Sequence, residues 1–282
     1  MTTRPLLKRM AEPVGDPNSL ARRRRIFRWR KKRSEFAKTM SMVEHLTELR
    51  RRLIVSLAGF LAVSLVAFVF FDQISDVLLR PLCGLPADRL GANGCKLVFT
   101  SALEPVAVRL KVTAMTGVVA SSPLWLYQLW AFIVPGLTSK ERKYALPFVA
   151  SSVCLFLFGT AFAYLTLPGA LSFLVGFGGD NLTPFFTANE YLGFVSLVII
   201  VFGVVFELPL LLFFLGLAEI VSVESLRRHR RIAIVGITVV SAVVTPSQDP
   251  YTMLAMSLPL YLFYELDIAL LRLRERRKRR SA

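Results

Sequence analysis

The stretch VIIVFGVVFELPLLLFF, residues 198–214, is apolar throughout except for Glu207. The hydrocarbon core of a bilayer is roughly 30 Å thick, and a helix needs about 20 apolar residues to cross it. Together with the apolar residues on either side, in 191–215, this stretch is long enough. It therefore predicts a membrane-spanning helix that carries a single carboxylic acid.

Comparable apolar segments recur along the chain. The sequence has 282 residues, is 54% hydrophobic and still has a formal net charge of +16, a combination that is rare in soluble domains. We expect an all-α integral membrane protein with six transmembrane helices, of which the fifth, which ends before Thr245-Pro246, and the sixth, which holds Pro259, are short. The expected spans are residues 53–71, 112–134, 146–167, 191–215, 232–244 and 253–271.

The basic residues predict the orientation. Most of the 35 lysines and arginines lie in residues 1–53, 135–145, 216–231 and 272–282. Because cytoplasmic loops are enriched in these residues, both termini are predicted to be cytoplasmic and the location to be the cell membrane.

The same pattern predicts the domain organisation. We expect a disordered basic arm (1–40), a membrane domain (41–271) and a basic tail (272–282). The arm's charge favours contact with membrane lipid, and nucleic-acid binding is not expected because no nucleic-acid-binding fold accompanies it.

Two cysteines fall in the first external loop. Cys83 and Cys95 can form a disulfide if that side of the membrane is oxidising, and the sequence leaves open whether they do. Cys154 lies within the third expected span, where a small apolar packing role is typical.

Several acids begin helices or lie near their starts. Ser101 with Glu104 and Thr187 with Glu190 match the capping-box pattern, in which the two side chains satisfy free backbone donors at a helix start. Glu48 lies on an amphipathic segment before the first span. From spacing alone it is either a solvated acid beside Arg52 or a functional residue.

Glu207 is the clearest candidate for function. No lysine, arginine or histidine occurs inside any of the six expected spans, and an intramembrane acid without a partner is a functional candidate. The alternative is a neutral acid hydrogen-bonded to a neighbouring helix. Pro209 removes a backbone donor nearby.

The sequence lacks the motifs of several enzyme classes. It has no phosphate-binding loop of the G-x-x-x-x-G-K-[ST] type, and its only histidines are His45 and His229, outside the spans. We therefore expect neither catalysis, nor a cofactor, nor a metal site.

Four stretches together resemble one family. HLTELRRRL (45–53), YQLWAFIVPGLTSKERK (127–143), FGVVFELP (202–209) and VVTPSQDP (243–250) are similar, in order, to the TatC subunit of the twin-arginine protein translocase. The resemblance implies a cup-shaped bundle of six helices that binds twin-arginine signal peptides of folded cargo at the cytoplasmic face. It also implies proton-gradient-driven export with single-span TatA-type and TatB-type partners and with other TatC copies.

The resemblance also implies roles for particular residues. The signal-peptide site falls on Glu48, Arg50, Phe132 and Glu141. Glu207 becomes a polar contact in a hydrated groove for the inserted peptide or a partner helix. Pro81 and Asp249 match positions that shape the external cap or meet a partner subunit. Where the family often has a glutamine after the last external loop, this chain has Thr252-Met253, which puts a polar partner contact there in doubt.

Two other classes were weighed. An ion-coupled small-solute transporter would use Glu207 as its proton site, but such proteins usually contain internal repeats, and no convincing repeat is found. A membrane insertase would be expected to place a basic residue in its groove. Neither class explains the motif at 127–143.

Overall fold

The computed structural model describes residues 42–86, 90, 94–133, 145–179, 184–245 and 249–281. The chain divides into two compact units, Met1–Arg51 and Arg52–Ala282. The predicted basic arm, 1–40, and Glu141 lie outside the described residues.

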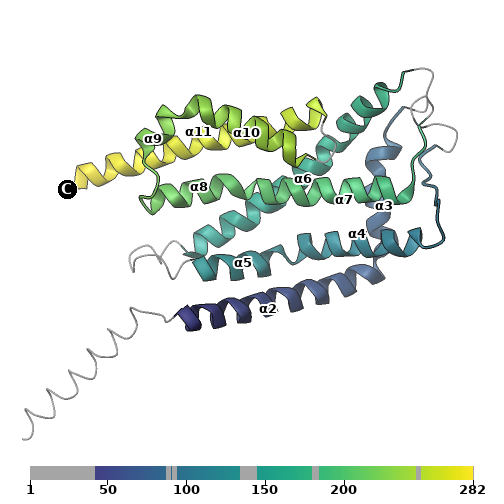
Figure 1. Ribbon diagram of the computed structural model, residues 1–282, viewed down its shortest axis with the longest axis horizontal. Helices are drawn as coiled ribbons and strands as arrows, with labels where there is room; N and C mark the ends of the chain where they lie inside the picture. The colour runs from purple at the N-terminus through teal and green to yellow at the C-terminus, as the bar shows by residue number, and fades with distance from the viewer. Residues whose placement is uncertain are drawn as a thin grey trace, which may run out of the picture. The chain divides into compact units, whose positions relative to one another are not determined.

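The described part of the chain is almost entirely helical (Figure 1). An isolated bridge between Val98 and Thr187 is its one element of extended pairing. The expectation of an all-α protein is therefore confirmed. The helices are α2 (Met42–Val69), α3 (Phe71–Cys83), α4 (Glu104–Ala120), α5 (Ser122–Ile133), α6 (Ala145–Gly176), α7 (Ala188–Val205), α8 (Glu207–Leu217), α9 (Val223–Arg228), α10 (Arg230–Val244) and α11 (Pro250–Ser281).

Four segments of the described chain are long and apolar enough to cross a membrane. They are Glu44–Val69, Leu146–Gly176, Ala188–Leu217 and Pro250–Arg277. The first corresponds to the first expected span, and the others to the third, fourth and sixth. The fifth expected span is the 15-residue helix α10, which is short, as predicted.

The second expected span is divided into α4 and α5. The helix is interrupted at Ser121, and Pro123 follows in the first turn of α5. A proline cannot donate to the carbonyl four residues before it. Close to this break the Trp125 indole N–H donates to the Val118 carbonyl at 3.0 Å, so a side chain adds a hydrogen bond next to the interruption of the helix.

The sixth span is longer than predicted. Helix α11 has 32 residues and continues through Pro259 and past Leu271. Six of the residues beyond Leu271 are arginines, and Leu273, Glu275 and Lys278 are also good helix formers. The apolar pattern predicted only residues 253–271. The helix continues beyond them because the residues that follow also favour helix.

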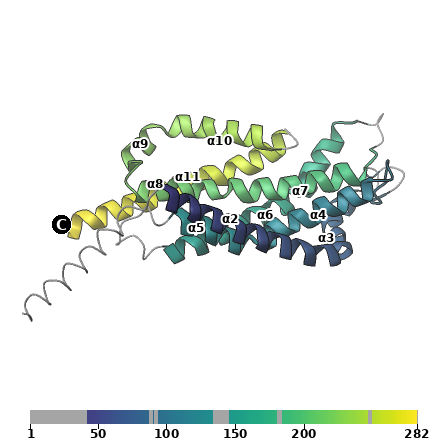
Figure 2. The same cartoon turned by 60° about the horizontal axis from the view of Figure 1, so that its bottom comes forward.

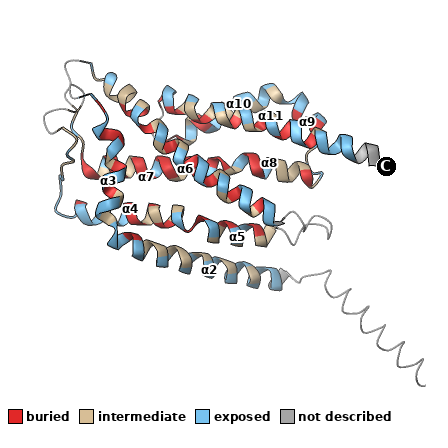
Figure 3. Cartoon of the chain, turned by 180° about the vertical axis from the view of Figure 1, so that it is seen from behind, coloured by how far each residue is buried: buried red, intermediate tan, exposed pale blue. Residues whose placement is uncertain are grey.

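The core of the second unit forms where α6 and α7 pack together and where α7 packs against α4. It includes Val112, Leu167, Val195, Phe202 and Met256, all less than 2% exposed. Figure 3 shows buried residues along α7, whereas α2 and α10 are mostly exposed. Those exposed apolar surfaces are typical of helices that face lipid or other proteins.

Glycines set the distance between α6 and α7. A Cβ atom at Gly159 would lie 2.8 Å from the Phe202 carbonyl oxygen and 2.9 Å from the Phe206 Cβ. A Cβ at Gly203, on the facing helix, would lie 2.8 Å from atoms of Phe156 and Thr160. Small residues that allow backbones to approach closely are the usual basis of helix packing in membranes.

We predict that Gly159→Ala destabilises the protein by about 1–3 kcal/mol, because the added methyl group meets backbone that cannot yield without moving a helix. Thermal unfolding of the purified protein in detergent measures this. The matched control is Gly236→Ala in α10, where a Cβ meets no atom within 4 Å and removing a glycine from a helix should stabilise by about 0.5–1 kcal/mol. Equal melting temperatures for the two variants would contradict the close approach of α6 and α7.

Candidate functional site

Glu207 lies where α7 gives way to α8. The N–H that Pro209 lacks would have bonded to the carbonyl of Val205, the last residue of α7. The acid therefore begins a new helical segment inside the apolar stretch. This places a carboxylate at a point where the backbone ladder is already weakened.

The Glu207 carboxylate has a partner on the neighbouring helix α6. The fully buried Ser152 hydroxyl donates to Glu207 Oε2 at 2.7 Å. The other oxygen, Oε1, is buried and has no hydrogen-bond partner among the described residues. The hydrogen bond matches the alternative drawn from the sequence, an acid bonded to a neighbouring helix. The second oxygen can still accept a hydrogen bond from a ligand.

The other expected peptide-binding residues lie on different segments. Glu48 is half-buried and Arg50 exposed, both near the start of α2. Phe132 is half-buried, one residue before the end of α5. Glu141 lies outside the described residues, so the geometry of the complete set stays a prediction.

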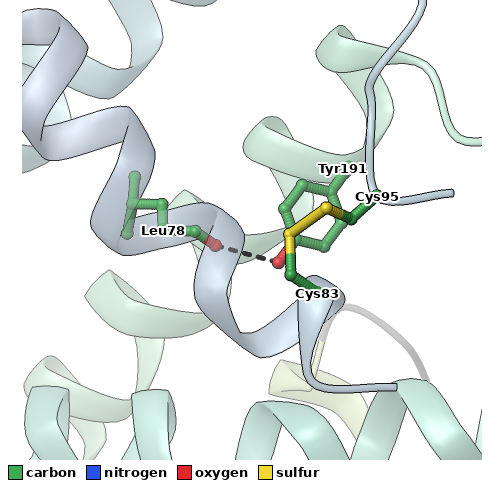
Figure 4. The surroundings of a disulfide bond; sticks show 4 residues. All are labelled: Leu78, Cys83, Cys95 and Tyr191. Atoms are coloured by element: carbon green, nitrogen blue, oxygen red, sulfur yellow. Dashed lines mark hydrogen bonds between the residues drawn. A yellow bond between two sulfur atoms is a disulfide. The ribbon is translucent and has the colours of Figure 1, made fainter. Parts of the chain in front are cut away.

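A disulfide holds the C-terminal end of α3. Cys83, its last residue, forms a disulfide with Cys95, with the two Cα atoms 5.0 Å apart. Beside the disulfide, the Tyr191 hydroxyl of α7 donates to the Leu78 carbonyl at 2.9 Å (Figure 4). The disulfide and this hydrogen bond thus attach α3 both to the loop that follows it and to the start of α7.

Glu104 fixes the same region by hydrogen bonds. Its carboxylate accepts from the Thr100 N–H at 2.6 Å, from the Thr100 hydroxyl at 2.9 Å and from the Asn189 N–H at 2.8 Å. Backbone donation from Thr100 and Asn189 lowers the pKa of this carboxyl below its ordinary value of 4.5. One contact of the predicted capping box is not formed, because the Ser101 hydroxyl accepts from the Leu103 N–H at 3.4 Å, whereas the Glu104 N–H donates to the Ser101 carbonyl. The Glu104 carboxylate does bond to the Ser101 backbone as predicted, and it also joins the loop between α3 and α4 to the start of α7. At Thr187 one of the two contacts of the predicted capping box is formed, because the Thr187 hydroxyl accepts from the Glu190 N–H at 3.3 Å.

Asp249 and Pro81 are both buried. Asp249 accepts from the Thr252 N–H at 2.8 Å and from the Thr252 hydroxyl at 2.6 Å, which caps the start of α11. These contacts favour the anchoring role that the sequence left open for Asp249. Thr252, found where the family often has glutamine, is used inside the chain. Pro81 lies within α3, two residues before the disulfide.

Sequence reasoning missed several polar groups near the spans. Ser152 was hidden in the third apolar stretch, where a serine gives no distinctive signal. Arg230 Nη2 donates to Glu265 Oε2 at 2.7 Å, which joins α10 to α11. Asp267 is buried on α11, and its Oδ2 has no hydrogen-bond partner among the described residues. Among those residues, no group of three or more potential metal ligands comes together.

Comparison with known proteins connects these features to one family. A family model described as Sec-independent protein translocase protein (TatC) matches residues 44–259. The TatC protein of Frankia casuarinae is 46% identical over 255 residues, covering 88% of this chain and 70% of the relative. That of Koribacter versatilis is 40% identical over 253 residues, covering 88% of this chain and 92% of the relative.

A solved structure has the same fold. The crystal structure of a twin-arginine translocase receptor, TatC, in the detergent DDM superimposes with a TM-score of 0.69 at 36% sequence identity. The match covers 80% of this chain and 99% of the solved chain. The path of the helices and about a third of the aligned residues are therefore shared.

We predict that Glu104→Gln lowers stability at neutral pH and that this loss shrinks in acid. A carboxyl whose pKa is lowered by folding contributes stability above its unfolded value of 4.5, and that contribution is lost as pH falls through the folded value. Unfolding of the wild type and the variant in detergent, compared from about pH 7 to below about pH 4, measures this. Glu190→Gln is the control, because the backbone N–H of Glu190 makes the cap contact. A loss from Glu104→Gln that does not change with pH would contradict the assignment.

Proposed function

Because this chain belongs to the TatC family of Sec-independent protein translocase proteins, we propose that it binds twin-arginine signal peptides of folded cargo proteins at the cytoplasmic face of the membrane. The observation that carries the proposal is the family match over residues 44–259. That range contains Glu48, Arg50, Phe132 and Glu141. The protein is a multi-pass membrane protein, and its role in protein translocation requires no covalent chemistry.

The chemistry of recognition centres on Glu48 and Glu141. An arginine presents two parallel N–H donors that match the two oxygens of a carboxylate, whereas a lysine presents a single compact charge. Two acids therefore suit a pair of consecutive arginines and discriminate against lysines. Phe132 adds an aromatic surface on which a guanidinium can stack.

The orientation follows from charge. With the basic segments on the cytoplasmic side, Glu48, Phe132 and Glu141 all belong to cytoplasmic ends of helices or to cytoplasmic loops. The disulfide clamp of Cys83 and Cys95 then lies on the external side, where disulfides persist.

The proposed partners are single-span subunits of the TatA and TatB types and other copies of this chain. Glu207 supports this part of the proposal, because its Oε1 is buried without a hydrogen-bond partner among the described residues. A polar side chain from an inserted signal peptide or from a partner helix would satisfy it. Export would be driven by the proton gradient, as the family resemblance implies.

We predict that the purified protein in nanodiscs binds a twin-arginine signal peptide at least about tenfold more tightly than the same peptide with both arginines changed to lysine. Glu48→Ala and Glu141→Ala should each remove most of this preference, because each takes away one acceptor for a guanidinium. Fluorescence anisotropy with a labelled peptide measures the affinities.

The matched control is Glu44→Ala, which removes an exposed acid one helical turn before Glu48 and should leave the preference unchanged. If the wild type binds both peptides equally, or if Glu44→Ala has the same effect as Glu48→Ala, the proposed recognition site is wrong. In the second case the preference reflects overall charge.

We also predict that Glu207→Gln reduces export less than Glu207→Leu does. Glutamine retains an oxygen for Ser152 and a polar group for a ligand, whereas leucine leaves the buried serine hydroxyl without this acceptor. Export of a folded reporter in cells that depend on this chain measures the difference. Equal loss from both substitutions would show that an ionisable group is required.

A further inference from the structure

Pro81 lies inside α3 and leaves one carbonyl of that helix without its usual donor. Helix α3 packs against α4 and α6 at one end of the bundle (Figure 1 and Figure 2). In a regular α-helix the N–H of residue 81 would donate to the carbonyl of Val77, four residues earlier. Proline has no N–H, so this bond is missing from the ladder of α3.

The hydroxyl of Tyr164 on α6 supplies the missing donor. It donates to the Val77 carbonyl at 2.8 Å, across a sequence separation of 87 residues. The side chains of Val77 and of Leu165, which follows Tyr164, are both exposed. This surface is therefore apolar, and within a bilayer no water is at hand to bond to the carbonyl. A tyrosine suits such a place, because it carries its hydroxyl on an apolar ring.

A second tyrosine bonds to the next carbonyl of the same turn. The buried Tyr191 hydroxyl of α7 donates to the Leu78 carbonyl at 2.9 Å (Figure 4). The regular helical donor to Leu78 is the N–H of Leu82, and the Leu82 backbone also interacts with the Tyr191 hydroxyl. Two consecutive carbonyls before Pro81 thus bond to tyrosines that belong to two other helices.

Pro81 itself is buried, together with Leu78 and Leu82. A buried side chain is not available for direct contact with a partner subunit. Any requirement for Pro81 then has to act through the attachments of α3. What the proline changes is the Val77 carbonyl, which it frees from the backbone ladder and leaves open to a side chain from α6.

We propose that Pro81 and Tyr164 work as a pair, in which the proline frees the Val77 carbonyl and the Tyr164 hydroxyl uses it to fix α3 against α6. Tyr191 fixes the same turn against α7. Tyr164 is a positioning residue for the cap that the family resemblance implies, and Pro81 acts through it. The pairing stands apart from the proposed function, and only its role in export rests on that function.

A double-mutant cycle tests the pair. Tyr164→Phe removes only the hydroxyl, and it should lower the melting temperature of the full-length protein in detergent by about 2–4 °C, because the Val77 carbonyl is left unsatisfied. In the Pro81→Ala background the N–H of residue 81 can donate to Val77. Adding Tyr164→Phe there should lower the melting temperature by less than about half as much, since the two residues are coupled.

Tyr264→Phe is the matched control. It removes a tyrosine hydroxyl that also donates to a backbone carbonyl, that of Leu226 at 2.7 Å. Its effect should be the same in the wild type and in Pro81→Ala, because the residue four positions after Leu226 is Arg230, which keeps its N–H.

Two results would overturn the pairing. One is an equal cost of Tyr164→Phe in both backgrounds, since the hydroxyl would then contribute whether or not the proline is present. The other is a cost of Tyr264→Phe that depends equally on Pro81→Ala, since the coupling would then be unspecific. If Pro81→Ala does not yield folded protein, Pro81→Ser restores the same N–H and serves in its place.

Export of a folded reporter tests the positioning role. Tyr164→Phe should reduce export, whereas adding it to Pro81→Ala should cause no further loss. Full export by Tyr164→Phe would overturn the positioning role and leave a purely structural bond. Binding of the twin-arginine peptide, measured on the same variants, separates the two proposals, because a wild type without preference for arginine contradicts the proposed function and leaves the melting-temperature cycle unaffected.

Discussion

The structure depends on one constraint, that backbone polar groups within a hydrocarbon core must be hydrogen-bonded inside the protein. Helices meet this demand along their length, and the described residues are accordingly almost all helical. The demand is hardest to meet at prolines. The Trp125 indole donates to a carbonyl close to the break before Pro123, and Glu207 begins a new helical segment next to Pro209. The proposed intramembrane polar site therefore coincides with an interruption of the backbone ladder.

Close packing allows a polar contact to form in this environment. Gly159 and Gly203 bring α6 and α7 together, and the Ser152 hydroxyl reaches Glu207 from the adjoining part of α6. A carboxylate in hydrocarbon is costly, and a serine supplies only one hydrogen bond. The other carboxylate oxygen, Oε1, is buried and has no hydrogen-bond partner among the described residues, so it can accept a hydrogen bond from a ligand. Such an acceptor suits a protein whose relatives are translocase components.

The end of the bundle that carries the Cys83–Cys95 disulfide is fixed differently. There the Cys83–Cys95 disulfide, the Tyr191 hydroxyl and the Glu104 carboxylate join α3, the first external loop and the start of α7. At the opposite end the contacts are an ion pair between Arg230 and Glu265 and the Tyr264 hydroxyl bond to Leu226. A disulfide thus helps to hold the end that we propose is external, whereas an ion pair and a hydrogen bond help to hold the end that we propose faces the cytoplasm and binds cargo.

By itself the sequence determined the all-helical class, the long first, third and fourth spans and the short fifth, because apolar length and proline position act locally along the chain. It also singled out Glu207, since one acid in an apolar stretch is visible without a fold. Only the tertiary structure decided that Ser152 is its partner, that Glu104 also bonds to Asn189, and that Asp249 caps α11. Each of these depends on which groups folding brings within hydrogen-bond reach, and for Ser152 and Asn189 the partners are far apart in sequence.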